Sequence, residues 1–216
     1  MKLAFSTLAC PDWTWQEVVE AAHSLGYDGI EWRLVDGATL TGEFSAKMAA
    51  QIQKAVAKAG LTTNAMDTGI SLAVAPGADR DRLLEEARAM LKLATAFGTD
   101  TVRMFPGTYP QTVSDEQAIC WVIDSICQLA PDAKALGVKI ALEIHDTFDW
   151  QRRRLRGTTS SSFTAQVLAR ISSPETGILW DLGNPYLEGE RPEQTWKNVR
   201  NKLLYLHTKD MRPQSA

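Results

Sequence analysis

Hydrophobic and polar positions follow two alternating patterns along the whole chain. Short apolar runs bounded by glycine or polar residues predict buried parallel strands, and longer segments with apolar residues three and four apart predict amphipathic helices. The predicted strands are 3–8, 30–33, 61–66, 101–105, 138–145, 177–181 and 203–206, and the predicted helices are 15–25, 44–59, 79–97, 114–136, 163–171 and 192–199. This order is typical of repeated βα units with parallel strands and right-handed crossovers.

Capping signals mark several of the boundaries. Thr14 stands before the first predicted helix as an N-cap, and Gly98 and Gly137 follow two others at the position where helices end in a left-handed residue. With 216 residues and 44% hydrophobic content, the chain can bury one substantial core. We therefore predict an α/β fold of the TIM type, a (β/α) barrel with seven recognisable βα units, in a single domain over residues 1–216.

Three of the predicted strands end in a residue that can bind metal. These residues are Glu143, Asp181 and His207. In a (β/α) barrel the carboxyl ends of all strands face one mouth, which is where the chemistry takes place. Two carboxylates and an imidazole that converge there form a reasonable ligand set for one divalent cation.

Each of these residues also has a structural interpretation. Glu143 can be a buried carboxylate paired with an arginine, because carboxylates are almost never buried without a partner. Asp181 can cap the turn that follows its strand, and His207 can be a satisfied core histidine. The position of Glu143 two residues before His145, on the same side of one strand, favours a functional site.

Other polar residues near strand ends are candidates for substrate contacts. His145 can bind substrate or donate a supporting hydrogen bond. Lys209 can bind a phosphate, carboxylate or oxyanion of the substrate. Glu31 and Arg33 share one face of the second strand and can touch substrate, although an ion pair between them is the favoured interpretation. Arg103 on the fourth strand can likewise form an ion pair or touch substrate.

Composition limits the classes of binding partner and the cellular compartment that we expect. The net charge of −3 provides no diffuse basic field for nucleic acid or an anionic membrane. No apolar run approaches the roughly 20 residues of a membrane span. Three cysteines, an odd number, argue for a reducing compartment, and we expect a cytoplasmic protein. Cys120 and Cys127, seven apart in one predicted helix, are expected to be buried as small apolar residues.

Four short motifs resemble the sugar phosphate isomerase/epimerase family, which has a xylose isomerase-like TIM barrel. They are Asp28-Gly-Ile-Glu-Trp-Arg33, Ala141-Leu-Glu-Ile-His-Asp146, Leu179-Trp-Asp-Leu-Gly-Asn-Pro-Tyr186 and Tyr205-Leu-His-Thr-Lys-Asp210. The resemblance implies one divalent metal, Mn, Co, Mg or Zn, held by Glu, Asp, His and Glu from strands five to eight. The first three ligands correspond to Glu143, Asp181 and His207.

The sequence departs from the family pattern at two points. The fourth ligand, a glutamate at the end of strand eight, has no counterpart, so we expect a barrel that lacks its C-terminal strand and helix. The exposed strand edges that this leaves would favour pairing with another chain, and a homodimer is therefore expected. Asn184 stands where many relatives place a histidine near the substrate, and its amide can hydrogen-bond a sugar hydroxyl.

The resemblance implies a metal-dependent isomerase or epimerase that acts on a small sugar or sugar phosphate. Proton transfer through an enediolate is the expected mechanism, with Glu143 as the catalytic carboxylate. A lyase or dehydratase on the same scaffold is one alternative, and a truncated barrel that binds metal or sugar without turnover is another. A nuclease of the same superfamily needs several zinc ions and many histidines, whereas this chain has three histidines.

Overall fold

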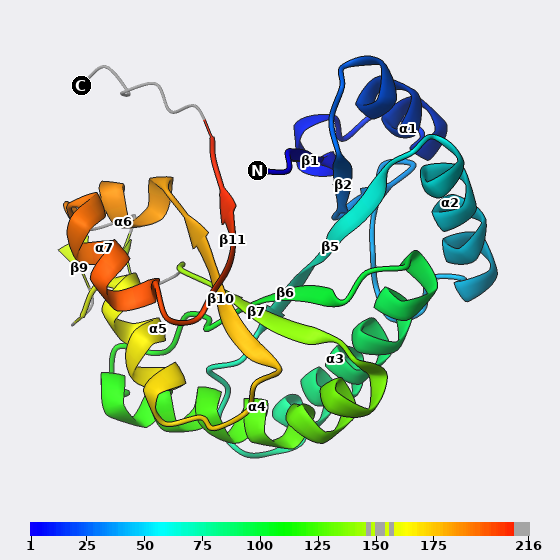
Figure 1. Ribbon diagram of the computed structural model, residues 1–216. Helices are drawn as coiled ribbons and strands as arrows, with labels where there is room; N and C mark the ends of the chain where they lie inside the picture. The colour runs from blue at the N-terminus through cyan, green and yellow to red at the C-terminus, as the bar shows by residue number, and fades with distance from the viewer. Residues whose placement is uncertain (146–147, 150–153, 156–157, 210–216) are drawn as a thin grey trace. The chain divides into compact units, whose positions relative to one another are not determined.

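The chain alternates strands and helices, as a computed structural model shows (Figure 1). The structure describes residues 1–145, 148–149, 154–155 and 158–209. Seven strands form one parallel sheet in the order β1-β2-β5-β6-β7-β10-β11. The strands are β1 (Ala4–Ser6), β2 (Gly29–Trp32), β5 (Thr62–Ser71), β6 (Thr101–Phe105), β7 (Lys139–Glu143), β10 (Thr176–Asp181) and β11 (Leu203–His207).

Helices connect the successive strands of this sheet. A short 3-10 helix, η1 (Thr7–Ala9), follows β1, and the α-helices are α1 (Trp15–Ser24), α2 (Ala46–Lys58), α3 (Ala78–Phe97), α4 (Asp115–Leu136), α5 (Ser160–Ala169), α6 (Gly183–Leu187) and α7 (Pro192–Val199). The seven predicted strands and six predicted helices are all present, so the predicted α/β fold with seven parallel strands is confirmed.

Strand β5 is longer than the apolar pattern predicts, because it continues to Ser71 instead of ending at Met66. In the sequence alone, the polar residues Asp67 and Thr68 indicate the start of a turn after the apolar run. Both are fully buried, and the Thr68 hydroxyl donates a hydrogen bond of 2.7 Å to the backbone oxygen of Arg103 on β6. The neighbouring strand satisfies these polar groups, and the strand therefore continues.

Small elements that the apolar pattern does not predict lie between the main ones. A hairpin joins β3 (Leu34–Val35) to β4 (Ala38–Thr39). Its turn, Asp36-Gly37, has φ values of 51° and 78°, which is the Asp-Gly conformation that two-residue hairpin turns require. A second short pair joins β8 (Phe148–Asp149) to β9 (Arg154–Leu155).

The chain divides into two compact units, each assembled from three segments. Unit 1 comprises Met1–Gly69, Arg82–Arg103 and Leu129–Ile140, and unit 2 comprises Ile70–Asp81, Met104–Gln128 and Ala141–Ala216. In unit 1, the Phe97 ring lies 6.0 Å from Trp32 and 5.8 Å from Phe44, centroid to centroid. In unit 2, Tyr109 stacks on Phe163 at 5.9 Å. A single domain over residues 1–216 stays a prediction.

The buried face of α4 explains why one cysteine prediction is wrong. Cys127 is exposed and Cys120 is half-buried. The buried positions of this helix are Ala118, Ile119, Val122, Ser125, Ile126, Leu129 and Ala133. The two cysteines flank that stripe instead of lying on it.

Among the helices of the described chain, none has the combination of length and apolar content that a membrane crossing requires.

The predicted N-cap of the first helix is a full capping box. The Thr14 hydroxyl accepts a hydrogen bond from the Glu17 amide (3.3 Å), and the Glu17 carboxylate accepts one from the Thr14 amide (2.7 Å). The hydrogen bonds from the backbone and then the side chain of Thr14 lower the pKa of Glu17 below its ordinary value of 4.5. The box therefore satisfies two amides at the start of α1.

Replacing Thr14 by Ala should lower the free energy of unfolding by about 1 kcal/mol, because the amide of Glu17 loses its acceptor. The pKa of Glu17 is lowered in the folded chain. The ionised carboxylate therefore stabilises the folded state above pH 4.5, and this stabilisation is lost as the pH falls through the lowered pKa. The difference between Thr14→Ala and the natural chain should shrink in acid. Urea unfolding at pH 7 and pH 3.5 measures it, with the exposed Gln16→Ala as the control; equal stability of both variants at pH 7 would contradict the role of the box.

Candidate metal centre

The three predicted metal ligands end three strands of unit 2. Glu143 ends β7, Asp181 ends β10 and His207 ends β11. Asp181 and His207 are direct partners in the parallel register of β10 and β11. One ligand atom from each of the three residues lies within 4.8 Å of the other two. The structure therefore brings the three predicted ligands together.

Close packing of β10 against β11 sets this register. A Cβ atom on Gly177 would lie 2.5 Å from Cγ of Leu204 and 2.7 Å from the backbone oxygen of Lys202. Only glycine fits at this approach. The register then shifts between Ile178 and Leu179, after which the pairs run in step to the ends of both strands.

Asp181 acts as a cap and also faces the candidate centre. Its Oδ1 accepts hydrogen bonds from the amides of Gly183 (2.7 Å) and Asn184 (3.2 Å), and its Oδ2 lies 2.9 Å from Nζ of Lys209. The Asp181 side chain is 5% exposed, and these contacts fix its orientation. The cap and the ligand interpretations of this residue are therefore compatible.

Asn184 holds the neighbouring groups in place. Its amide nitrogen donates to the backbone oxygen of Ile144 (2.9 Å) and, at 3.5 Å, to Glu143 Oε1, while its Oδ1 accepts from Lys209 Nζ (3.2 Å). Glu143 is 5% exposed. Asn184 and Lys209, both predicted as substrate contacts, thus orient the two carboxylates from which a ligand set would be built.

Aromatic rings border the two histidines of this unit. The ring of half-buried His145 lies 5.0 Å from Phe105, and His207 packs edge-on against Tyr205 at 5.4 Å. These contacts restrict the rotation of both imidazoles. Asp146 and Asp210, which close two of the sequence motifs, lie outside the described residues.

The predicted contacts Glu31 and Arg103 belong to unit 1. Arg103 forms a buried, two-pronged ion pair with Asp67: Nε to Oδ1 is 3.0 Å and Nη2 to Oδ2 is 2.8 Å. Its Nη1 donates to the backbone oxygen of Thr68 at 3.0 Å. Glu31 is 3% exposed. Sequence reasoning missed Asp67, because an aspartate directly after the apolar run of β5 is also what a turn would show.

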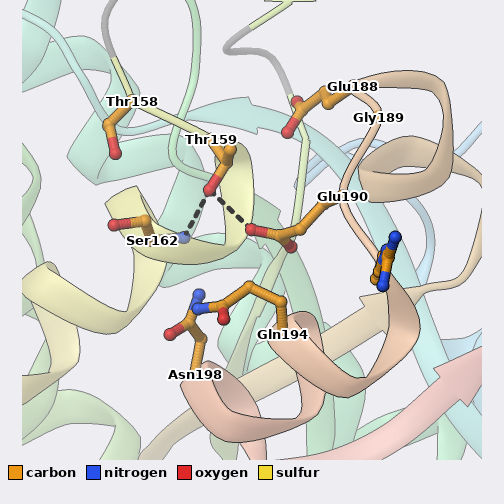
Figure 2. A pocket seen from close by; sticks show the side chains of 9 residues that line it. Thr158, Thr159, Ser162, Glu188, Gly189, Glu190, Gln194 and Asn198 are labelled. Carbon is orange, nitrogen blue, oxygen red and sulfur yellow. Dashed lines mark hydrogen bonds between the residues drawn. The ribbon is translucent and has the colours of Figure 1, made fainter.

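A separate open pocket of about 710 Å³ lies in unit 2, beside α5 and α7. Figure 2 shows the Thr159 hydroxyl between the Ser162 amide (3.3 Å) and the Glu190 carboxylate (2.8 Å). Glu190 also accepts hydrogen bonds from the hydroxyls of Ser161 and Thr195, each at 2.6 Å. None of the predicted site residues lines this pocket within the described chain. Its polar groups tie α5 to α7.

Sequence comparison assigns the family. The profile of the xylose isomerase-like TIM barrel family matches residues 19–216. The chain belongs to this family. A comparison with curated proteins gives no match. Membership of the xylose isomerase-like family agrees with the resemblance that the four motifs carry and with the seven parallel strands.

Solved structures of the same fold span more residues than this chain. The IOLI protein with a binding zinc atom is 18% identical, with a TM-score of 0.79, and the match covers 99% of this chain and 74% of that one. D-psicose 3-epimerase in the presence of D-fructose is 16% identical (TM-score 0.77; 96% and 73% covered). The probable 3-DHS dehydratase AsbF from Bacillus anthracis is 16% identical (TM-score 0.74; 96% and 72%). At these identities the likeness establishes the xylose isomerase-like fold.

Proposed function

We propose that this chain is a metal-dependent isomerase or epimerase of a sugar or sugar derivative. The observation that carries the proposal is the convergence of Glu143, Asp181 and His207, whose ligand atoms lie within 4.8 Å of one another. Ligand atoms on one shared ion lie up to about 4.4 Å apart, because each is about 2.0–2.2 Å from the metal. The limit of 4.8 Å that all three pairs satisfy is only slightly larger than this value.

The chemistry of the donor set fits a divalent cation. Two carboxylates and one imidazole suit Mn, Co, Mg or Zn. The carboxylates are nearly buried, and neighbouring groups fix their orientation, as the contacts of Asp181 with two amides and of Glu143 with Asn184 show. When bound, a divalent ion supplies Lewis acidity toward a carbonyl and a neighbouring hydroxyl.

Residues of the chain transfer the proton, position the carboxylates and contact the substrate. Glu143 is the carboxylate that we assign as general base: it takes the proton α to the substrate carbonyl. Return of that proton to the adjacent carbon isomerises the sugar, and return to the opposite face epimerises it. Asn184 and Lys209 keep Glu143 and Asp181 in position. We assign substrate contact to His145, which follows the end of β7 and whose ring lies 5.0 Å from Phe105.

Calorimetric titration of the full, chelator-treated chain with Mn²⁺ tests the centre. We expect one binding event in the natural chain and an affinity at least roughly tenfold lower in Glu143→Gln and Asp181→Asn, because each loses a charged ligand without losing its shape. Asp181→Asn retains an oxygen that can accept the two amide hydrogen bonds. Glu193→Gln on the exposed first turn of α7 is the control. Equal affinity of all four proteins would refute the centre.

Turnover separates the proposed activity from the alternatives. With Mn²⁺ or Co²⁺ present, a panel of ketoses and keto-sugar derivatives in deuterated water should show deuterium uptake at the carbon next to the carbonyl. Glu143→Gln should abolish this exchange. Loss of water from the substrate would indicate a dehydratase, the activity named for one structure of this fold. Metal binding without exchange would favour a binding protein.

A further inference from the structure

The backbone at Arg33 is fixed at the end of β2. Thr7, 1% exposed, accepts hydrogen bonds on its hydroxyl oxygen from the amides of Arg33 and Leu34, both at 2.9 Å. One buried hydroxyl thus clamps two successive residues where the strand ends. The half-buried side chain of Arg33 therefore starts from a rigid point in unit 1.

The guanidinium of Arg33 lies over a glycine of the adjacent strand β5. A Cβ atom on Gly69 would be 3.2 Å from Nη2, 3.7 Å from Nη1 and 3.9 Å from Cζ of Arg33. Because Gly69 has no side chain, the planar guanidinium of Arg33 can lie against the backbone of β5. Arg33 and Gly69 both belong to unit 1.

No carboxylate of the described chain forms an ion pair with this guanidinium, although the charge of Asp67 acts on it. Both oxygens of Asp67 are taken by Arg103, and within residues 1–145, 148–149, 154–155 and 158–209 the Arg33 side chain makes no hydrogen bond or ion pair. The ion pair with Glu31 that the sequence favours is therefore not formed among the described residues. Burial and then the charge of Arg103 lower the pKa of Arg33, whereas Asp67 raises it.

We propose that Arg33 anchors a binding site for an oxyanion, the phosphate or carboxylate group of a small-molecule ligand. The Arg33 guanidinium is half-buried, and no direct hydrogen bond or ion pair with the described residues replaces the hydration that burial removes. Its planar fork of donors matches phosphate and carboxylate oxygens, with two parallel hydrogen bonds. The backbone of Arg33 is held by the Thr7 hydroxyl, and its guanidinium rests against Gly69, so the donors are positioned before a ligand binds. The test of this site uses no metal, so its outcome is independent of the test of the metal centre.

Thermal unfolding and calorimetry of the full chain test the site, with inorganic phosphate as the probe and chelator present throughout. The natural chain should show a saturable rise of Tm with phosphate relative to chloride at equal ionic strength. Arg33→Met should weaken phosphate binding by roughly tenfold or more. Arg88→Met is the matched control, because it removes the same charge from unit 1 at an arginine already paired with Asp132 at 2.9 Å. Its phosphate response should equal that of the natural chain.

Two further variants separate a binding role from a structural one. Gly69→Ala leaves the arginine in place but brings a methyl group against its guanidinium, so phosphate binding should weaken while the fold stays intact. Arg33→Lys keeps the charge but loses the fork and should bind less tightly than the natural chain. Acetate in place of phosphate shows whether carboxylates also bind.

The outcomes that overturn the proposal are distinct. An equal phosphate response in Arg33→Met and the natural chain would place the anion elsewhere. The absence of a saturable response to phosphate and to acetate would remove the site. A Tm of Arg33→Met far below that of Arg88→Met without phosphate would make Arg33 a structural residue. None of these results depends on the metal titration of Glu143 and Asp181.

Discussion

Replacing Asp67 by Asn is expected to lower the free energy of unfolding by about 3–5 kcal/mol, because it leaves the charge of Arg103 buried without a counter-charge. The pair is almost fully excluded from water: the two side chains are 5% and 0% exposed. Asparagine keeps the shape of aspartate, so the loss would report the charge and not a cavity. Urea or guanidinium unfolding followed by circular dichroism measures the effect.

The double variant Asp67→Leu with Arg103→Met is the decisive control. A buried ion pair replaced by apolar residues of similar size often costs little, whereas removal of one partner is severe. We therefore expect the double variant to recover most of the stability lost in Asp67→Asn. If the double variant is as unstable as the single one, the pair is needed for its hydrogen bonds, including that of Arg103 to the Thr68 backbone.

Replacing Glu190 by Ala should destabilise the chain by about 2–4 kcal/mol, since three hydroxyl groups would lose a charged acceptor. The hydroxyls belong to Thr159, Ser161 and Thr195, and they lie 2.6–2.8 Å from the carboxylate oxygens. Ser161 and Thr195 are 0% and 1% exposed, so their hydroxyl groups depend on the Glu190 carboxylate for a hydrogen-bond acceptor in the folded chain. The α5–α7 contact should loosen first.

Hydrogen exchange resolved by mass spectrometry locates this effect. Amides of α5 and α7 should exchange faster in Glu190→Ala, while those of α1 and α2 in unit 1 keep the natural rates. Glu193→Ala, at an exposed position three residues further along, should change stability by less than about 0.5 kcal/mol. Uniformly faster exchange throughout the chain would show that Glu190 supports more than the contact between these two helices.

The order of strands and helices, and the positions of the three candidate ligands, could be predicted from local sequence. Glu143, Asp181 and His207 each end a short apolar run, and parallel strands bring such ends to one edge of the sheet. This inference needs only the strand boundaries and the direction of the chain. The register shift that pairs Asp181 with His207 adjusts the geometry without changing the residues involved.

Partners distant in sequence could not be predicted. Asp67 and Arg103 are separated by 36 residues, and no local pattern distinguishes this pair from an aspartate in a turn. The same holds for Glu190, whose partner Thr159 is 31 residues away. The sequence shows that Asn184 follows Asp181, and this position predicts a substrate contact. The hydrogen bond from Asn184 to the Ile144 backbone cannot be seen in the sequence. Burial of polar groups is decided by tertiary packing.

The way in which the two units share the chain limits how this protein can be cut. Six segments alternate between the units, so the chain passes from one to the other five times. Three of these passages fall inside strands, at Gly69/Ile70 in β5, at Arg103/Met104 in β6 and at Ile140/Ala141 in β7. No single break in the polypeptide separates the units into two continuous fragments. Expressing either unit alone would require rejoining three pieces by new loops.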